Sequence, residues 1–126
     1  MKILVVDDEL DVQALFEQRF RREIRSGALS FLFAFSGEQA LEYLHKHHSE
    51  VVLILSDINM PGMSGLELLR RVRTEAAPPP PPRVMMITAY GDDDSRRQAL
   101  ALGADDFLTK PVDFAALKEK LLALPA

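Results

Sequence analysis

The amino-acid sequence predicts a doubly wound α/β domain, in which helices cover both faces of one parallel sheet. Short apolar runs recur five times along the chain, and continuous apolarity over a short run is typical of a strand that is buried on both faces. A segment with apolar residues at helical spacing follows each run. Strict alternation of strand and helix indicates a parallel sheet with right-handed crossovers.

The first 50 residues supply two of these units. A buried strand is expected over residues 2–6, and the helix after it carries its apolar residues at helical spacing (Val12, Leu15, Phe16, Phe20). Residues 28–35 alternate in apolarity, which predicts a second strand at the edge of the sheet. Ser36 and Gln39 form a capping box, so we expect a helix to begin there and to bury Ala40, Leu41 and Leu44.

The residues from 51 onward supply three more units. Strands are expected over 51–55, 83–88 and 106–109, with helices between them. The helix starts are marked by a capping box at Ser64 and Glu67 and by Asp113, and Gly103 is a predicted helix stop. The core-facing residues of these helices are expected to include Leu66, Leu69, Val72, Phe114, Leu117, Leu121 and Leu122. We therefore predict a single domain over residues 1–126, with strand order 2-1-3-4-5 and no output domain in this chain.

Composition restricts the kinds of function. The 126 residues include no cysteine, which excludes disulfides and thiolate chemistry, and they carry a net charge of −4. An acidic chain does not favour direct binding of nucleic acid. No apolar run approaches the roughly 20 residues of a membrane span, and acids follow the first strand where a signal peptide would stay apolar. The sequence therefore predicts a cytoplasmic protein that does not contact a membrane.

Polar residues stand at the ends of four of the five predicted strands, namely Asp7 and Asp8, Asp57, Thr88, and Lys110. In the order 2-1-3-4-5 the first and third strands are neighbours, so three carboxylates are expected to meet in one crevice. Clustered carboxylates without His or Cys favour a hard cation, with Mg²⁺ as the first choice and Mn²⁺ as the second. Each residue alone has an ordinary explanation: Asp57 as a turn former, Asp8 as a helix cap, Thr88 as a strand residue and Lys110 as a solvated loop residue.

Taken together, these residues at the strand ends indicate a specific chemistry. A carboxylate nucleophile, a divalent cation, a lysine and a hydroxyl are the groups that phosphoryl transfer requires. Four segments in this order resemble the response-regulator receiver domain of two-component signalling over essentially the whole chain: VVDDE, LSDINMPGMSG, ITAYGD and FLTKP. The fold that this resemblance implies is flavodoxin-like.

The resemblance assigns a role to each site residue. Asp57 would be the phosphoacceptor, Asp7 and Asp8 would be metal-side acids together with Asp57, and Asn59 would offer its backbone carbonyl to the metal. The expected phosphoryl-binding and switch residues are Thr88, Lys110, Phe107 and Tyr90, and the Lys110–Pro111 peptide bond is expected to be cis. Phe107 has no hydroxyl and is equally explained as a core residue. The implied partners are a histidine kinase or phosphotransfer protein, a downstream effector or output domain, and a second copy in a phosphorylation-dependent homodimer.

Two other functions are compatible with parts of the pattern. A Mg²⁺-dependent phosphatase of the haloacid-dehalogenase-like kind also forms an aspartyl phosphate, but it uses an Asp two residues after the nucleophile. That position is Asn59, which cannot shuttle a proton. A pseudo-receiver that binds partners without phosphorylation would not need the complete set of acids.

Several further stretches are better explained by structure than by function. His45 to His48 and the arginines at 19, 21, 22 and 25 are predicted to lie near helix C-termini, where positive charge is stabilising. The acids of GDDDS are expected at a helix start. Pro78 to Pro82 are expected to stiffen a connection, with an aromatic groove on a partner as the alternative.

Overall fold

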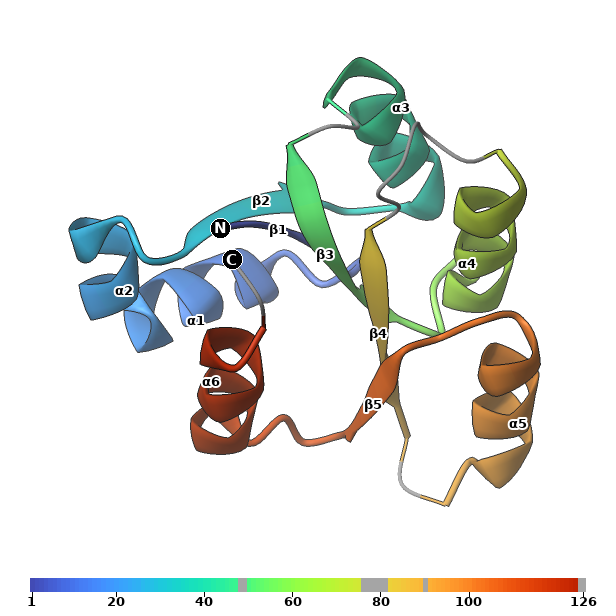
Figure 1. Ribbon diagram of the computed structural model, residues 1–126. Coiled ribbons are helices and arrows are strands. Elements are labelled where there is room, and N and C mark those ends of the chain that lie inside the picture. The colour runs from blue at the N-terminus through green and yellow to red at the C-terminus, as the bar shows by residue number, and fades with distance from the viewer. Residues whose placement is uncertain (48–49, 76–81, 90, 125–126) are drawn as a thin grey trace.

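The computed structural model describes residues 1–47, 50–75, 82–89 and 91–124. At its centre lies a five-stranded parallel sheet of order β2-β1-β3-β4-β5, as the sequence predicts (Figure 1). The strands are β1 (Lys2–Val6), β2 (Ser30–Ala34), β3 (Val51–Asp57), β4 (Arg83–Thr88) and β5 (Asp106–Thr109). β2 and β5 form the two edges of the sheet. The three central strands, β1, β3 and β4, are buried along most of their length.

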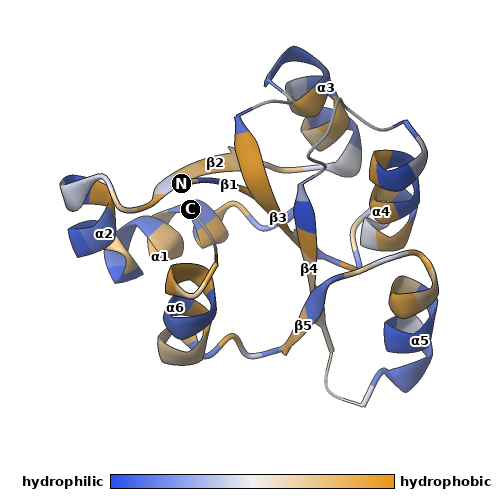
Figure 2. Ribbon diagram, viewed as in Figure 1, coloured by the Kyte–Doolittle hydropathy of each residue, from blue (hydrophilic) through white to orange (hydrophobic). Residues whose placement is uncertain are grey.

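Helices lie on both sides of this sheet (Figure 1). One side carries α1 (Asp11–Arg19), α2 (Arg21–Ser26) and α6 (Phe114–Leu122), and the other carries α3 (Gly37–His47), α4 (Gly65–Thr74) and α5 (Asp93–Ala101). Two separate apolar cores result, because successive side chains of a strand point to opposite faces. Ile3 and Val5 of β1 pack with the α1 and α6 side, whereas Leu4 and Val6 pack with the α3 and α4 side. Figure 2 shows β3 as hydrophobic along most of its length, in agreement with its place between these cores.

The predicted helix caps are confirmed. The Ser64 side chain accepts a hydrogen bond from the Glu67 N–H at 3.1 Å, and Asp113 accepts from the N–H groups of Ala115 and Ala116. Ser36 accepts from the Gln39 N–H at 3.0 Å. These side chains satisfy N–H groups that have no partner within the helix, which sets where each helix begins.

The alternative interpretation of Asp8 as a helix cap is wrong. Helix α1 begins at Asp11, its N-cap position is Leu10, and no side chain bonds its first N–H groups. The predicted first helix is also two helices, since the chain leaves helical geometry at Phe20 and resumes at Arg21.

Some apolar residues lie outside the core, against expectation. Leu15 is 40% exposed and Leu122 is 53% exposed. Each lies next to a buried pair at i, i+4 spacing, Phe16 with Phe20 and Leu117 with Leu121. A residue one position from such a pair is rotated by about 100° around the helix, which turns it away from the sheet. Leu66 packs against the core as predicted, although it is only half-buried.

The expectations for Tyr90, His48 and most of the proline run fall outside the described residues; Pro82, at the end of that run, is buried. Within the described ranges, every helix is too short or too polar to span a lipid bilayer.

Candidate functional site

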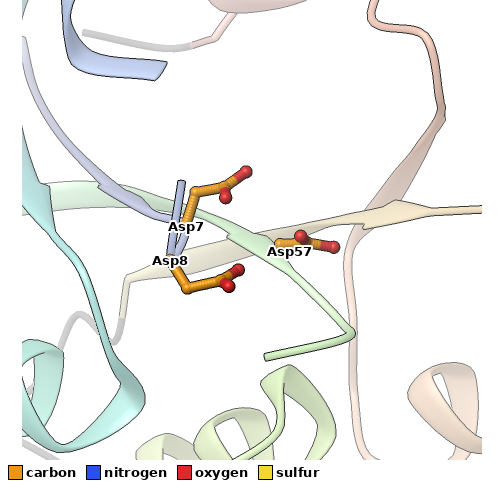
Figure 3. Close-up of side chains that lie close together, drawn as sticks. All are labelled: Asp7, Asp8 and Asp57. Carbon is orange, nitrogen blue, oxygen red and sulfur yellow. The ribbon is translucent and has the colours of Figure 1, made fainter. Parts of the chain in front are cut away.

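The three aspartates lie together at the carboxyl ends of two neighbouring strands. Asp57 is the last residue of β3, and Asp7 and Asp8 follow β1, whose Val6 is paired with Ser56. One carboxylate oxygen from each residue lies within 4.8 Å of the others. Figure 3 shows the three carboxylate groups close together and pointing in a similar direction. The predicted crevice is therefore present, because parallel neighbouring strands end at the same edge.

The surroundings of Asp7 disfavour the charged form of its carboxyl group. Its side chain is buried, and burial raises the pKa of its carboxyl; the negative charge of Asp57 raises it further. A hydrogen bond from the Glu9 N–H at 2.9 Å lowers the pKa without cancelling the rise. Oxygen ligands that repel one another at this spacing suit a hard divalent cation, since its charge would compensate theirs.

Lys110 forms an ion pair with Asp57. Its Nζ donates to Asp57 Oδ2 at 2.9 Å, and Asp57 is buried with 2% exposure. Burial lowers the pKa of the lysine, but the hydrogen bond to Asp57 and the negative charge of that residue outweigh it, so the pKa of Lys110 is raised. Lys110 therefore stays protonated beside the Asp57 carboxylate.

Thr88 ends β4 at the same edge of the sheet. It is 1% exposed, and its hydroxyl donates to the Leu108 carbonyl at a long 3.4 Å. Its own carbonyl accepts from the Lys110 N–H at 2.9 Å, which ties the end of β4 to the start of the loop after β5. The next peptide bond, Lys110–Pro111, is cis as predicted.

Asn59 and Phe107, the other two predicted site residues whose positions are described, have fewer contacts with the three aspartates. Asn59 is exposed in the loop after β3, and its N–H donates to Asp57 Oδ1 at 3.4 Å. Phe107 is half-buried against the core on the α3 and α4 side, with the Arg96 guanidinium 5.1 Å from the centre of its ring. Phe107 therefore has a packing role already, as the sequence allows.

A groove opens from this site between α1 and the start of α6. It has a volume of about 470 Å³ and combines charged residues at the site with apolar walls (Asp7, Glu9, Leu15, Phe16, Ile87, Lys110, Pro111, Val112, Phe114). The exposed Leu15 thus lies at the edge of the groove.

Two residues beside Asp57 were missed by the reasoning from sequence. The Ser56 hydroxyl donates to the Asp57 carbonyl at 3.0 Å, and Gly65 lies in contact with the same carbonyl. A glycine in the first turn of a helix was a usable signal, because glycine is a poor helix former and requires another reason to stand there.

Comparison with known proteins identifies the family to which the chain belongs. Residues 3–122 match the family model of the response regulator receiver domain. The chain is 37% identical over 124 residues to the response regulator RppA of Synechocystis, covering 98% of this chain and 50% of RppA. It is 33% identical over 124 residues to the two-component response regulator PhoP of Pseudomonas aeruginosa, covering 98% of this chain and 51% of PhoP.

Solved structures agree. A receiver domain protein from Clostridium thermocellum superposes with a TM-score of 0.81 at 27% identity, covering 95% of this chain and 90% of that one. The chemotaxis protein CheY4 of Vibrio cholerae gives 0.79 at 26% identity, with 95% and 94% covered. The chain spans about half the length of RppA and PhoP. With a matching family model, a shared fold and an acidic crevice at the expected strand ends, the chain belongs to the receiver domains of two-component response regulators.

Proposed function

We propose that Asp57 accepts a phosphoryl group from a phosphohistidine on a histidine kinase or phosphotransfer protein, and that this modification switches the surface around the site. The observation that carries the proposal is the convergence on Asp57: a buried carboxylate paired with Lys110 at 2.9 Å and grouped with two further carboxylates within 4.8 Å. Phosphoryl transfer depends mainly on positioning and on neutralising charge, and these residues supply both.

The donor set fits a divalent cation, and Asp7, Asp8 and Asp57 would hold it with the backbone carbonyl of Asn59. Bound Mg²⁺, or Mn²⁺ in its place, would neutralise negative charge on the transferring group. Lys110 would hold the phosphoryl oxygens by its positive charge, and the Thr88 hydroxyl would exchange its long bond to Leu108 for one to the phosphoryl group.

The transfer itself forms one bond and breaks one. A carboxylate oxygen of Asp57 bonds to phosphorus, the P–N bond of the phosphohistidine breaks, and the imidazole leaves after taking up a proton. Lys110 already lies beside Asp57, so the negative charge of the phosphoryl group on Asp57 would meet a positive charge that is already in place. We infer that Phe107, whose ring packs between the core and Arg96, and Tyr90 change position with Thr88 and transmit the signal.

The groove beside Asp57 supports a helical protein partner as the donor. Leu10 is 70% exposed and Leu15 is 40% exposed near the N-terminal half of α1, and Leu15, Pro111 and Val112 line the groove that begins at Asp7 and Lys110. An apolar groove next to the reacting carboxylate suits an amphipathic helix that presents its histidine at the groove end. One solved relative, the receiver domain of yeast Ssk1, is described in a complex with the phosphotransfer protein Ypd1, and it superposes with a TM-score of 0.81 at 26% identity. We also propose that phosphorylation controls a downstream effector or output domain and that it promotes a homodimer.

Incubation with acetyl phosphate and Mg²⁺, followed by intact mass measurement, tests the proposal. Wild type should gain one phosphoryl group, and Asp57→Asn should gain none. Asp94→Asn is the matched control, because it removes an exposed carboxylate on α5 outside the cluster. Continuous release of phosphate without a stable adduct would instead favour a phosphatase, a function that Asn59 argues against because its amide cannot act as a general acid or base. No adduct on wild type would contradict the proposal.

A further inference from the structure

The main-chain carbonyl of Asp57 has two unusually close neighbours. The Ser56 hydroxyl donates to it at 3.0 Å. Gly65, the first residue of α4, lies so near that a Cβ atom at this position would be 2.1 Å from the Asp57 oxygen, 2.9 Å from its carbon and 2.8 Å from Ile58 Cα. Real Cβ atoms essentially never approach other atoms closer than 3.0 Å. Glycine is therefore required at position 65 for space, and the atoms that demand it are backbone.

The same contact closes the loop that follows the phosphoacceptor. The Gly65 N–H donates to the Ile58 carbonyl at 2.7 Å, so the two ends of loop 58–64 are joined at the base. Ser64 caps α4 directly before this point. Asn59, near the start of the loop, donates its N–H to the Asp57 carboxylate. The start of α4 is thus tied to the last peptide of β3.

We propose that Gly65 and Ser56 are positioning residues for phosphoryl acceptance, holding the Asp57 peptide so that its carboxylate stays in register with Asp7, Asp8 and Lys110. The inference rests on the proposed function of Asp57. Neither residue touches reacting atoms; both act through the Asp57 backbone. A side chain at 65 must move that backbone or α4 by about 1 Å to reach an acceptable contact, and an error of about 1 Å in a reacting group costs on the order of 100-fold in rate.

Gly37 offers a matched control for the loss of a crowded glycine. It too is the first residue of its helix, α3, and a Cβ there would lie 2.8 Å from Met63 Sδ and 2.9 Å from Met63 Cγ. Sδ and Cγ belong to a flexible side chain that can rotate away, and Met63 Cβ, at 3.0 Å, needs to shift by only a few tenths of an ångström. The change of glycine to alanine is therefore chemically identical at the two positions, but the new methyl group meets side-chain atoms at position 37 and the phosphoacceptor backbone at position 65.

The test compares wild type, Gly65→Ala, Ser56→Ala and Gly37→Ala in three measurements: calorimetric titration with Mg²⁺ in the absence of a phosphodonor, the rate of phosphorylation by acetyl phosphate, and thermal unfolding. We expect Gly65→Ala to weaken Mg²⁺ binding by about tenfold or more and to slow phosphorylation by roughly 100-fold. Ser56→Ala removes one hydrogen bond to the Asp57 carbonyl and adds no atom beside it. It should weaken Mg²⁺ binding and slow phosphorylation by about threefold to tenfold each. Gly37→Ala should stay within about twofold of wild type in both.

Leu44→Ala separates positioning from stability. Leu44 is 7% exposed on α3 in the same core as α4, so we expect its truncation to lower the Tm while Mg²⁺ binding and the rate of phosphorylation stay near wild type. Folded Gly65→Ala and Ser56→Ala with wild-type Mg²⁺ affinity and phosphorylation rate would overturn the inference, whatever their Tm. If Gly65→Ala does not fold, Ser56→Ala alone decides in the same way. A wild type that gains no phosphoryl group would instead contradict the function proposed for Asp57.

Discussion

Asp7 carries its carboxylate into a site that favours the neutral form. Its side chain is 6% exposed, and burial together with the charge of Asp57 raises its pKa despite the bond from the Glu9 N–H. A carboxyl whose pKa is higher in the folded than in the unfolded protein destabilises the fold when ionised. That penalty is present at pH values above the folded pKa, and it disappears as the pH falls through the folded pKa toward the ordinary aspartate value.

We therefore expect Asp7→Asn to raise the Tm in metal-free buffer at neutral pH, by roughly 2–5 °C if the gain is about 1 kcal/mol. Asparagine mimics the protonated side chain, so the difference from wild type should shrink as the pH is lowered through the pKa of Asp7. Thermal unfolding in EDTA between neutral and acidic pH measures this. Asp94→Asn should not raise the Tm, because the exposed carboxylate that it removes pairs with Arg97 and lies at the start of α5, where negative charge is stabilising. A lower Tm for Asp7→Asn at neutral pH would show that its hydrogen bond outweighs its burial.

Single residues divide clearly into those that sequence could predict and those that it could not. Asp7, Asp57 and Lys110 were predictable because the ends of parallel strands share one edge of the sheet, so strand order alone brings them together. Ser56 and Gly65 act through contacts with a backbone carbonyl, which depend on how closely α4 approaches β3. A glycine at a helix start indicates a constraint on position 65, but no spacing along the chain shows which atoms impose it.

Whole elements were predicted best where a local side chain defines their ends. Asp113 and Ser64 cap their helices, and Gly103 at a positive φ of 96° follows α5, as expected from residue type. The break between α1 and α2 was not predicted. Phe20 stands at the break and is 1% exposed, so the apolar spacing continues through a residue that is no longer helical.

Helix α4 is held at its C-terminal end by Arg73. Its guanidinium donates to the Gly103 carbonyl at 2.8 Å, the Pro82 carbonyl at 2.9 Å and the Asp105 carboxylate at 2.9 Å. Asp105 in turn accepts from the Val84 N–H at 2.7 Å. One side chain, 25% exposed, thus connects α4 to the segments that precede β4 and β5.

We expect Arg73→Lys to lower the free energy of unfolding by about 1–2 kcal/mol, because an ammonium group cannot reach three acceptors that are arranged around a planar guanidinium. Urea unfolding measures the change. Arg71→Lys is the control: its bonds to Glu75 are also double, but both partners are exposed on the surface of the same helix, so its cost should stay below about 0.5 kcal/mol. Equal losses in the two variants would show that Arg73 does not link these segments.

For the molecule as a whole, alternation of strand and helix predicted a doubly wound parallel sheet, and the observed order 2-1-3-4-5 is one of the two common orders of such sheets. It was not sufficient to predict which surface stays open. Leu15 and Leu122 were expected in the core because apolar residues usually cover a sheet, yet the buried pairs beside them already fill the available space. Exposure depends on the width of the helix face that contacts the sheet, and spacing in sequence defines that face only approximately.

The acidic site also links the stability of the whole molecule to divalent cations. A ligand that binds the folded state alone adds RT ln(1 + [L]/Kd), about 1.4 kcal/mol at ten times Kd. We expect Mg²⁺ to raise the wild-type Tm in this concentration-dependent way. Asp8→Asn should lose the effect, because it removes one of three clustered carboxylates. Because a net charge of −4 also makes the chain respond to general screening, NaCl at equal ionic strength is the solvent control, and Asp94→Asn is the charge-matched variant that should keep the response. Equal Mg²⁺ responses in Asp8→Asn and Asp94→Asn would mean that the cation acts on overall charge rather than at the crevice.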